Sequence, residues 1–257
     1  MHARPLLVLA LLAPALVRAD MMLKYASAAR PDETTVIQVK GTDVLVGDQS
    51  SKMLFQDGKQ QVTIIDHPSR TYMVMDEQAA QQMEQQMGAA QQQMSAMMQQ
   101  MEQQMQNMSE EQRAQIRQMM GNRMPSGAAR QPAKMTVQQQ GEDTVAGVTC
   151  TRFMVLVNDK PSGEVCAARA GVLGLQTKDY NTLVSATETV RKLMERISGQ
   201  HNTGTVTMNL RAMKGIPVRM RDLVDGDVST LVARSSAELN AADFRVPSGY
   251  RKRDMMQ

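Results

Sequence analysis

Aromatic, cysteine and histidine residues are all scarce in this sequence, which has 3 Phe, 4 Tyr, no Trp, 2 Cys and 3 His in 257 residues. A packed core must therefore be filled mainly by Val, Ile, Leu and Met. No His-Glu-x-x-His pattern occurs, and no serine has the Gly-x-Ser-x-Gly setting of a common nucleophile. We therefore expect a protein that is not an enzyme and that has no cofactor and no metal site.

The sequence also lacks an excess of charge of one sign. It has 29 basic and 26 acidic residues, and removal of an N-terminal signal with Arg4 and Arg18 leaves 27 minus 26, a net charge of +1. Nucleic acids and anionic membranes attract strongly basic surfaces. The balance therefore predicts no nucleic-acid partner.

Residues 1–19 predict an export signal. A short basic start precedes the apolar run Leu6–Val17, and Val17-Arg18-Ala19 offers residues that a signal peptidase tolerates. The run is too short for a comfortable membrane span, and no later stretch is apolar enough to cross a bilayer. We expect cleavage after Ala19, a periplasmic or secreted location, and no transmembrane segment in the mature chain.

The two cysteines, Cys150 and Cys166, lie in the exported part. An even pair in an oxidising compartment predicts a disulfide, although two buried free thiols are the alternative. If Val157 pairs with Glu164 in a simple hairpin, Cys166 faces Val155 and not Cys150. A disulfide then requires a bulge or a different neighbouring strand.

The stretch between Asp76 and Met120 is almost entirely Gln, Met, Ala and Glu, which are good helix formers. With Asp76 as N-cap, we predict helices near Glu77–Met108 and Glu110–Met120. Eight methionines at gaps typical of one helix face form the Met stripe: Met83, Met87, Met94, Met97, Met98, Met101, Met105 and Met108. Gln occupies the other faces, so the stripe resembles a heptad without charge pairs.

Short runs with turn punctuation flank this stretch and predict strands that pair in order as an antiparallel meander. A second amphipathic helix is predicted at Asp179–Ile197. The predicted strands are Leu23–Ser27, Thr34–Lys40, Val44–Val46, Lys52–Gln56, Gln61–Ile65, Thr71–Met75, Met135–Gln139, Cys150–Val157, Glu164–Ala168, Thr205–Ala212, Ile216–Leu223 and Val228–Ser235.

These elements predict an α+β fold: a curved antiparallel sheet, or half-open barrel, with helices on its concave face and a long Gln/Met-rich helical insert. One mature chain of this size can bury one substantial core. The predicted organisation is a signal at 1–19, the first half of the sheet at 20–76, the helical insert at 77–121, a linker at 122–134, and the second half of the sheet with one helix at 135–257.

Three motifs occur in order: Thr144-Val145-Ala146-Gly147-Val148-Thr149-Cys150-Thr151-Arg152-Phe153, Gly163-Glu164-Val165-Cys166-Ala167, and Phe244-Arg245-Val246-Pro247-Ser248-Gly249-Tyr250. With them the chain resembles an uncharacterised family of exported bacterial domains. The resemblance implies a fold similar to that of the periplasmic lipoprotein carriers, with helices plugging the mouth of the barrel. It brings no catalytic residues with it.

The leading hypothesis is a cell-envelope binding protein that holds a lipid, another apolar ligand or a partner segment in the groove of the curved sheet. A scaffold or self-associating protein acting through the Met stripe is the second hypothesis. Buffering of Cu(I) or oxidants by the methionines is the third, because thioethers are soft ligands and oxidise reversibly. The plainest alternatives are a closed core without ligand and a weakly selected Gln-rich insertion.

Overall fold

The computed structural model of this chain describes residues 20–106, 134–197 and 209–254. The helices are α1 (Glu77–Gln106), α3 (Thr177–Ile197) and α4 (Leu210–Met213), with 3₁₀ turns η1 (Asp57–Lys59) and η3 (Ala170–Leu173). The strands are β1 (Asp20–Ser27), β2 (Thr34–Lys40), β3 (Asp43–Gly47), β4 (Ser51–Gln56), β5 (Gln61–Asp66), β6 (Thr71–Met75), β7 (Met135–Val145), β8 (Val148–Val157), β9 (Lys160–Ala168), β10 (Ile216–Asp222), β11 (Val228–Ala237) and β12 (Arg251–Lys252).

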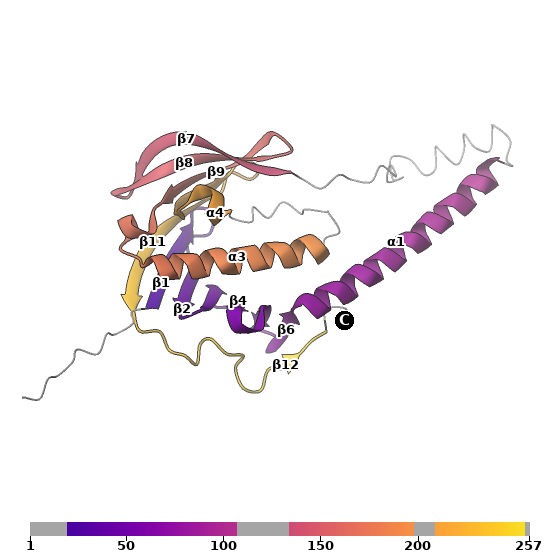
Figure 1. The fold of residues 1–257 in the computed structure, drawn as a ribbon, viewed down its shortest axis with the longest axis horizontal. Helices are drawn as coiled ribbons and strands as arrows, with labels where there is room; N and C mark the ends of the chain where they lie inside the picture. The colour runs from indigo at the N-terminus through magenta and orange to yellow at the C-terminus, as the bar shows by residue number, and fades with distance from the viewer. Residues whose placement is uncertain (1–19, 107–133, 198–208, 255–257) are drawn as a thin grey trace, which may run out of the picture.

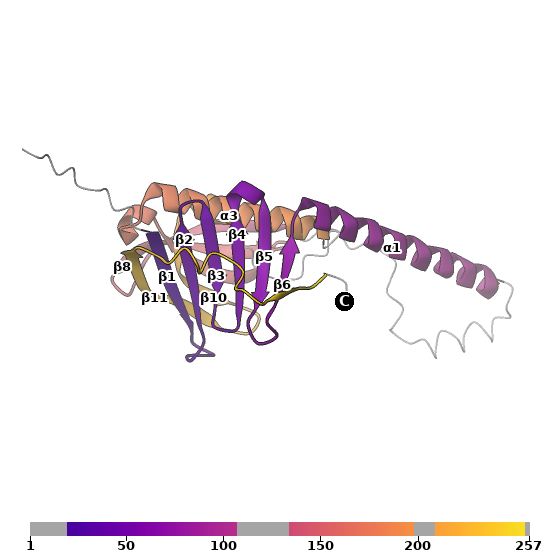
Figure 2. The same cartoon turned by 90° about the horizontal axis from the view of Figure 1, so that it is seen from below.

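All twelve strands form one open sheet in the order β12-β6-β5-β4-β3-β2-β1-β11-β10-β9-β8-β7. Neighbouring strands are antiparallel except β12, which pairs with β6 in parallel. The sheet curls so that β7–β9 lie on one side of α3 and β1–β6 on the other (Figures 1 and 2). The predicted curved sheet is confirmed, and its one parallel pair was not predicted.

The concave face of the sheet forms the main core with α3. Alternate residues of each strand face the helix, because side chains of a strand point to opposite faces in turn. The buried side chains of α3 in this core are Leu183, Val184, Ala186 and Leu193. Sheet residues of the same cluster include Leu23, Ile37, Val39, Val44, Phe55, Val62, Phe153, Val155, Val165 and Val218. The predicted helix at Asp179–Ile197 is therefore correct and begins two residues earlier.

A second, smaller core lies on the convex face, where the segment between β11 and β12 crosses the first strands of the sheet (Figure 2). Phe244 is buried against Leu45, Leu54 and Ile65. We call residues 238–250 the strap. Its last residue, Tyr250, lies 2.7 Å by its Oη from Nδ1 of His67, with the two rings edge to face.

Two local predictions are wrong. Residues 210–212, predicted as part of a strand, belong to α4, whose N-cap Asn209 accepts a hydrogen bond from the Ala212 N–H. The rest of that predicted strand, 205–208, lies outside the described residues. The strand predicted at Glu164–Ala168 begins four residues earlier, because β9 starts at Lys160.

The Gln/Met-rich stretch is helical as predicted for its described part. The Asp76 carboxylate accepts a hydrogen bond from the Ala79 N–H, which confirms the predicted N-cap. The 30 residues of α1 span roughly 45 Å at 1.5 Å per residue, and the helix leaves the body of the protein as a rod (Figure 1). The second predicted helix, 110–120, and most of the predicted linker lie outside the described residues.

Candidate functional site

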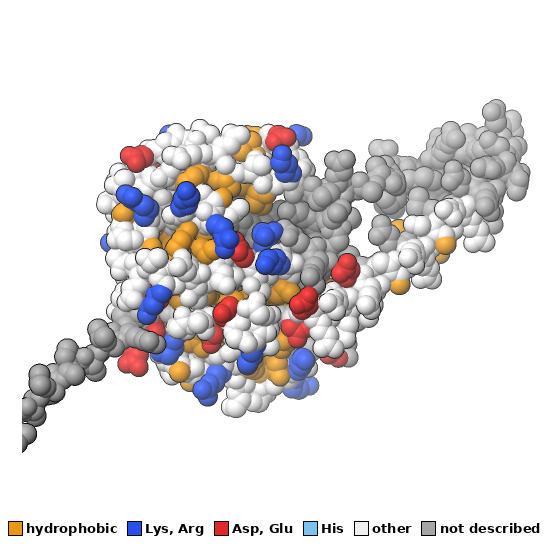
Figure 3. All heavy atoms as spheres, viewed as in Figure 1, with side chains coloured by type: hydrophobic (Ala, Val, Ile, Leu, Met, Phe, Trp, Pro, Cys, Tyr) orange, Lys and Arg blue, Asp and Glu red, His pale blue; other side chains and the backbone are white. Residues whose placement is uncertain are grey.

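The Met stripe divides along α1 into a base on the body and a projecting part. At the base, Ala80 is fully buried in the main core and Met83 is half-buried. Farther along, Met94 and Met97 are each 60% exposed. Figure 3 shows apolar side chains as separate patches along this otherwise polar rod. The helix therefore does not lie on the concave face of the sheet, which α3 occupies.

The remaining stripe residues are only partly described. Met87, Met98, Met101 and Met105 also lie in α1, whereas Met108 lies outside the described residues. The described stretch of α1 contains three acidic residues, Glu77, Glu84 and Glu102, and no Lys or Arg. The described helix therefore carries a small net negative charge, and methionine is the main apolar component of its projecting surface.

The predicted disulfide joins Cys150 of β8 to Cys166 of β9, with Cα atoms 5.5 Å apart. A two-residue turn, Asn158-Asp159, connects the strands, and both residues have left-handed φ angles of 52° and 61°. From Val157 opposite Lys160, unbroken pairing would set Cys166 opposite Thr151, on the other face from Cys150.

A register shift between Val155 and Leu156 corrects this mismatch. It moves Cys166 opposite Arg152, so that both cysteines lie on one face as a diagonal pair. The bulge that the sequence argument required is thus present, while the simple hairpin that pairs Val157 with Glu164 is wrong.

An ion pair crosses the disulfide on the same face. Asp143 of β7 lies opposite Cys150, and Arg219 of β10 lies opposite Cys166. Arg219 Nη2 is 2.8 Å from Asp143 Oδ2, so the pair reaches over the two strands that carry the sulfurs. Hydrogen bonds from the Thr144 backbone N–H and from Arg219 lower the pKa of the Asp143 carboxyl. Both cysteines are consequently buried, at 3% and 2% exposure.

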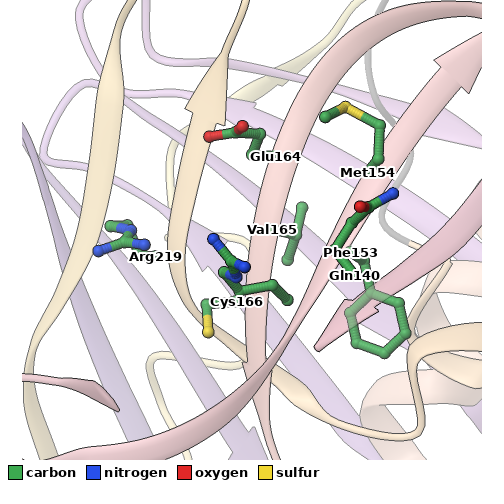
Figure 4. Close-up of a pocket in the computed structure, with 8 residues that line it drawn as sticks. Gln140, Phe153, Met154, Glu164, Val165, Cys166 and Arg219 are labelled. Carbon is green, nitrogen blue, oxygen red and sulfur yellow. The ribbon is translucent and has the colours of Figure 1, made fainter. Parts of the chain in front are cut away.

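A small hollow of about 120 Å³ lies beside this ion pair (Figure 4). Its lining comes from β7, β8, β9 and β10: Gln140, Arg152, Phe153, Met154, Glu164, Val165, Cys166 and Arg219. Ligand pockets usually enclose roughly 300–1,000 Å³. This hollow is therefore too small for an acyl chain.

Among residues 20–106, 134–197 and 209–254, no three His, Cys, Asp or Glu side chains converge as metal ligands. His67, the one histidine among them, contacts Tyr250 of the strap. Within the same ranges, no helix has both the length and the apolar character needed to cross a membrane.

The architecture defines a class: an open curved sheet that holds one helix in its hollow and carries a second helix as a projecting rod. A family model described as a domain of unknown function (DUF4412) matches residues 67–250. The chain belongs to this family. The match begins at His67 and ends at Tyr250, the two residues whose side chains join the strap to the β5–β6 turn.

The chain matches none of the curated proteins with which it was compared. Among solved structures, an uncharacterized conserved protein from Thermus thermophilus resembles it with a TM-score of 0.42 at 6% identity. That likeness covers 92% of this chain and 90% of the other.

Proposed function

We propose that this protein is a non-enzymatic binding protein of the cell envelope, exported by its N-terminal signal, that acts through the projecting part of α1. The observation that carries the proposal is the 60% exposure of Met94 and Met97 on a helix that leaves the body. Methionine is flexible and polarizable, so a stripe of it suits apolar contact with a helical partner.

The partner we propose is the same helix of a second copy. Like-with-like pairing of helices is opposed by charge when their faces carry many residues of one sign. The described helix carries three Glu in 30 residues, and Gln surrounds the stripe. Little charge therefore opposes pairing, and the roughly alternating three- and four-residue steps of the stripe fit a coiled-coil seam.

Sedimentation velocity of the mature chain tests this function. Met94→Gln with Met97→Gln makes the stripe polar while keeping helix propensity, and we expect it to shift dimer to monomer. Gln92→Ala with Gln99→Ala is the matched control, because these exposed residues lie on the opposite side of α1. The proposal would be contradicted if the unsubstituted chain were a monomer at all concentrations, or if the methionine and glutamine variants formed the same fraction of dimer.

A second candidate is a carrier of a lipid or other apolar ligand in the curved sheet, as the resemblance to lipoprotein carriers suggests. It is favoured by the concave face, whose apolar side chains are covered mainly by α3. The helix is held by apolar contacts, by the Glu188–Arg211 ion pair, and by hydrogen bonds from Tyr180 Oη to the Leu210 carbonyl at 2.8 Å and from Thr182 Oγ1 to the Gly41 carbonyl at 3.3 Å.

In this candidate, an acyl chain takes the place of α3 against the sheet. Native mass spectrometry after gentle extraction from the envelope tests it, with a matched preparation refolded from denaturant as the ligand-free control. A lipid adduct specific to the extracted protein supports a carrier. Recovery of bare protein alone from both preparations refutes it.

A further inference from the structure

The first turn of α3 buries a carboxylate that lacks a partner. Asp179 is 5% exposed, and among the described residues its carboxylate makes no hydrogen bond and no ion pair, so that its oxygens contact only solvent. Burial raises the pKa of this carboxyl, the neighbouring Lys178 opposes that rise, and the Asp20 carboxylate adds to it. A buried carboxylate is costly unless a positive charge or donor compensates it.

The start of β1 lies beside this turn. Both views of the fold place the first turn of α3 next to the beginning of β1 (Figures 1 and 2). Thr182, one turn after Asp179, donates a hydrogen bond to the carbonyl of Gly41 at the end of β2. Lys40, the residue before, reaches Asp20 Oδ2 with its Nζ at 2.7 Å. Asp20 itself is 7% exposed.

The Lys40 ammonium beside this turn already pairs with the Asp20 carboxylate. Asp20 Oδ2 accepts hydrogen bonds from the Lys40 Nζ at 2.7 Å and from the Leu239 backbone N–H at 2.8 Å. Lys178 is on the exposed side of α3. Of the two lysines near the carboxylates of Asp20 and Asp179, Lys40 pairs with Asp20 and Lys178 faces solvent. No positive charge among the described residues therefore pairs with Asp179.

We propose that Asp179 is the binding site for the α-ammonium group of Asp20, which exists only after the signal has been removed. Water cleaves the Ala19–Asp20 peptide bond: its hydroxyl joins the carbonyl carbon of Ala19 and its hydrogen joins the nitrogen of Asp20. The new amine then takes a proton from solvent and becomes the missing cation. This inference depends on the proposed export, and it ties processing to the seating of α3 on the sheet.

Four chains test the coupling: one beginning at Asp20 and one retaining Ala19, each with Asp179 and with Asp179→Asn. The added residue moves the ammonium by up to about 3.5 Å and changes no side chain from Asp20 onward. In the chain that begins at Asp20, we expect the substitution to lower the folding equilibrium constant about tenfold in urea titrations. In the chain that retains Ala19, we expect a loss below twofold, or a gain. Equal losses in both backgrounds would overturn the proposal.

A second readout separates an ion pair from mere packing. The α-amine of Asp20, labelled by ¹³C reductive methylation, is titrated by NMR in the chains that begin at Asp20. We expect its pKa to exceed the ordinary range of about 7.7–8.0 with Asp179 and to return to it with Asp179→Asn. An ordinary pKa in both chains refutes the ion pair.

The other charged groups near the amine are the same in every chain: the Asp20 carboxylate, Lys40 and Lys178. A change in the pKa of the α-amine that occurs only with Asp179→Asn is therefore due to the Asp179 side chain. These measurements need no partner or ligand. The mass of the protein recovered from the envelope tests export and cleavage separately, so failure of the proposed function is distinguishable from failure of the ion pair.

Discussion

Replacement of both Cys150 and Cys166 by Ala tests how much the β8–β9 disulfide contributes to stability. The cysteines are 16 residues apart, and closing a loop of this length lowers the entropy of the unfolded chain by an amount worth about 3 kcal/mol at 25 °C. The native hairpin keeps its strand pairing and its bulge without the sulfurs. We therefore expect a loss of about 3 kcal/mol, which corresponds to a melting temperature lower by roughly 6–12 °C in a chain of this size.

Urea unfolding followed by circular dichroism measures this loss. The control is the unsubstituted chain unfolded with and without reductant, which removes the same bond while leaving both side chains in place. We also expect the folded protein to resist reductant, because the disulfide is buried beneath the Asp143–Arg219 pair. Equal free energies of unfolding for oxidised and reduced chains, or free thiols in protein recovered from the envelope, would refute the reasoning.

Three other substitutions give expected outcomes. Leu183→Ala removes a side chain buried between α3 and the sheet and is expected to cost about 2–5 kcal/mol in urea unfolding, whereas exposed Asn181→Ala changes little. Tyr250→Phe removes the hydrogen bond to His67 and is expected to cost about 0.5–1.5 kcal/mol; no loss would show that this hydrogen bond does not stabilise the strap. Hydrogen bonds from the Ala29 N–H and Ser27 lower the pKa of Asp227, so its stabilisation is full above the unfolded pKa of about 3.9 and disappears as pH falls through the folded value. Urea unfolding from pH 7 to pH 2 should therefore show Asp227→Asn and the parent chain converging at low pH, and a constant difference would contradict this.

Much of the fold was predictable because its strands are short, close in sequence and separated by turn residues. Local pairing then sets the order β1–β2 and β3 through β6. The long-range steps were not predictable. The return of β11 beside β1 and the passage of the strap over the convex face depend on contacts between residues some 200 positions apart, such as Leu239 N–H to Asp20.

The candidate site shows the same division. Helical spacing predicted the Met stripe, and Asp76 predicted where α1 begins, because both are local patterns. Whether the stripe faces the sheet or solvent was left open, since it depends on α3 occupying the hollow. The pairing of the cysteines depends on a bulge at Val155, for which no residue of the sequence gives a clear signal. The unpartnered Asp179 was missed because one Asp in a first helical turn is an ordinary residue.

A photo-crosslinking residue placed in α1 tests most directly whether the projecting Met stripe contacts another protein chain. With the crosslinker in place of Met97, irradiation of whole cells is expected to yield a discrete product at twice the mass of the mature chain. The same residue in place of Gln92, on the opposite side of the helix, is expected to yield little. No product from position 97, or equal products from both positions, would contradict a function based on this stripe.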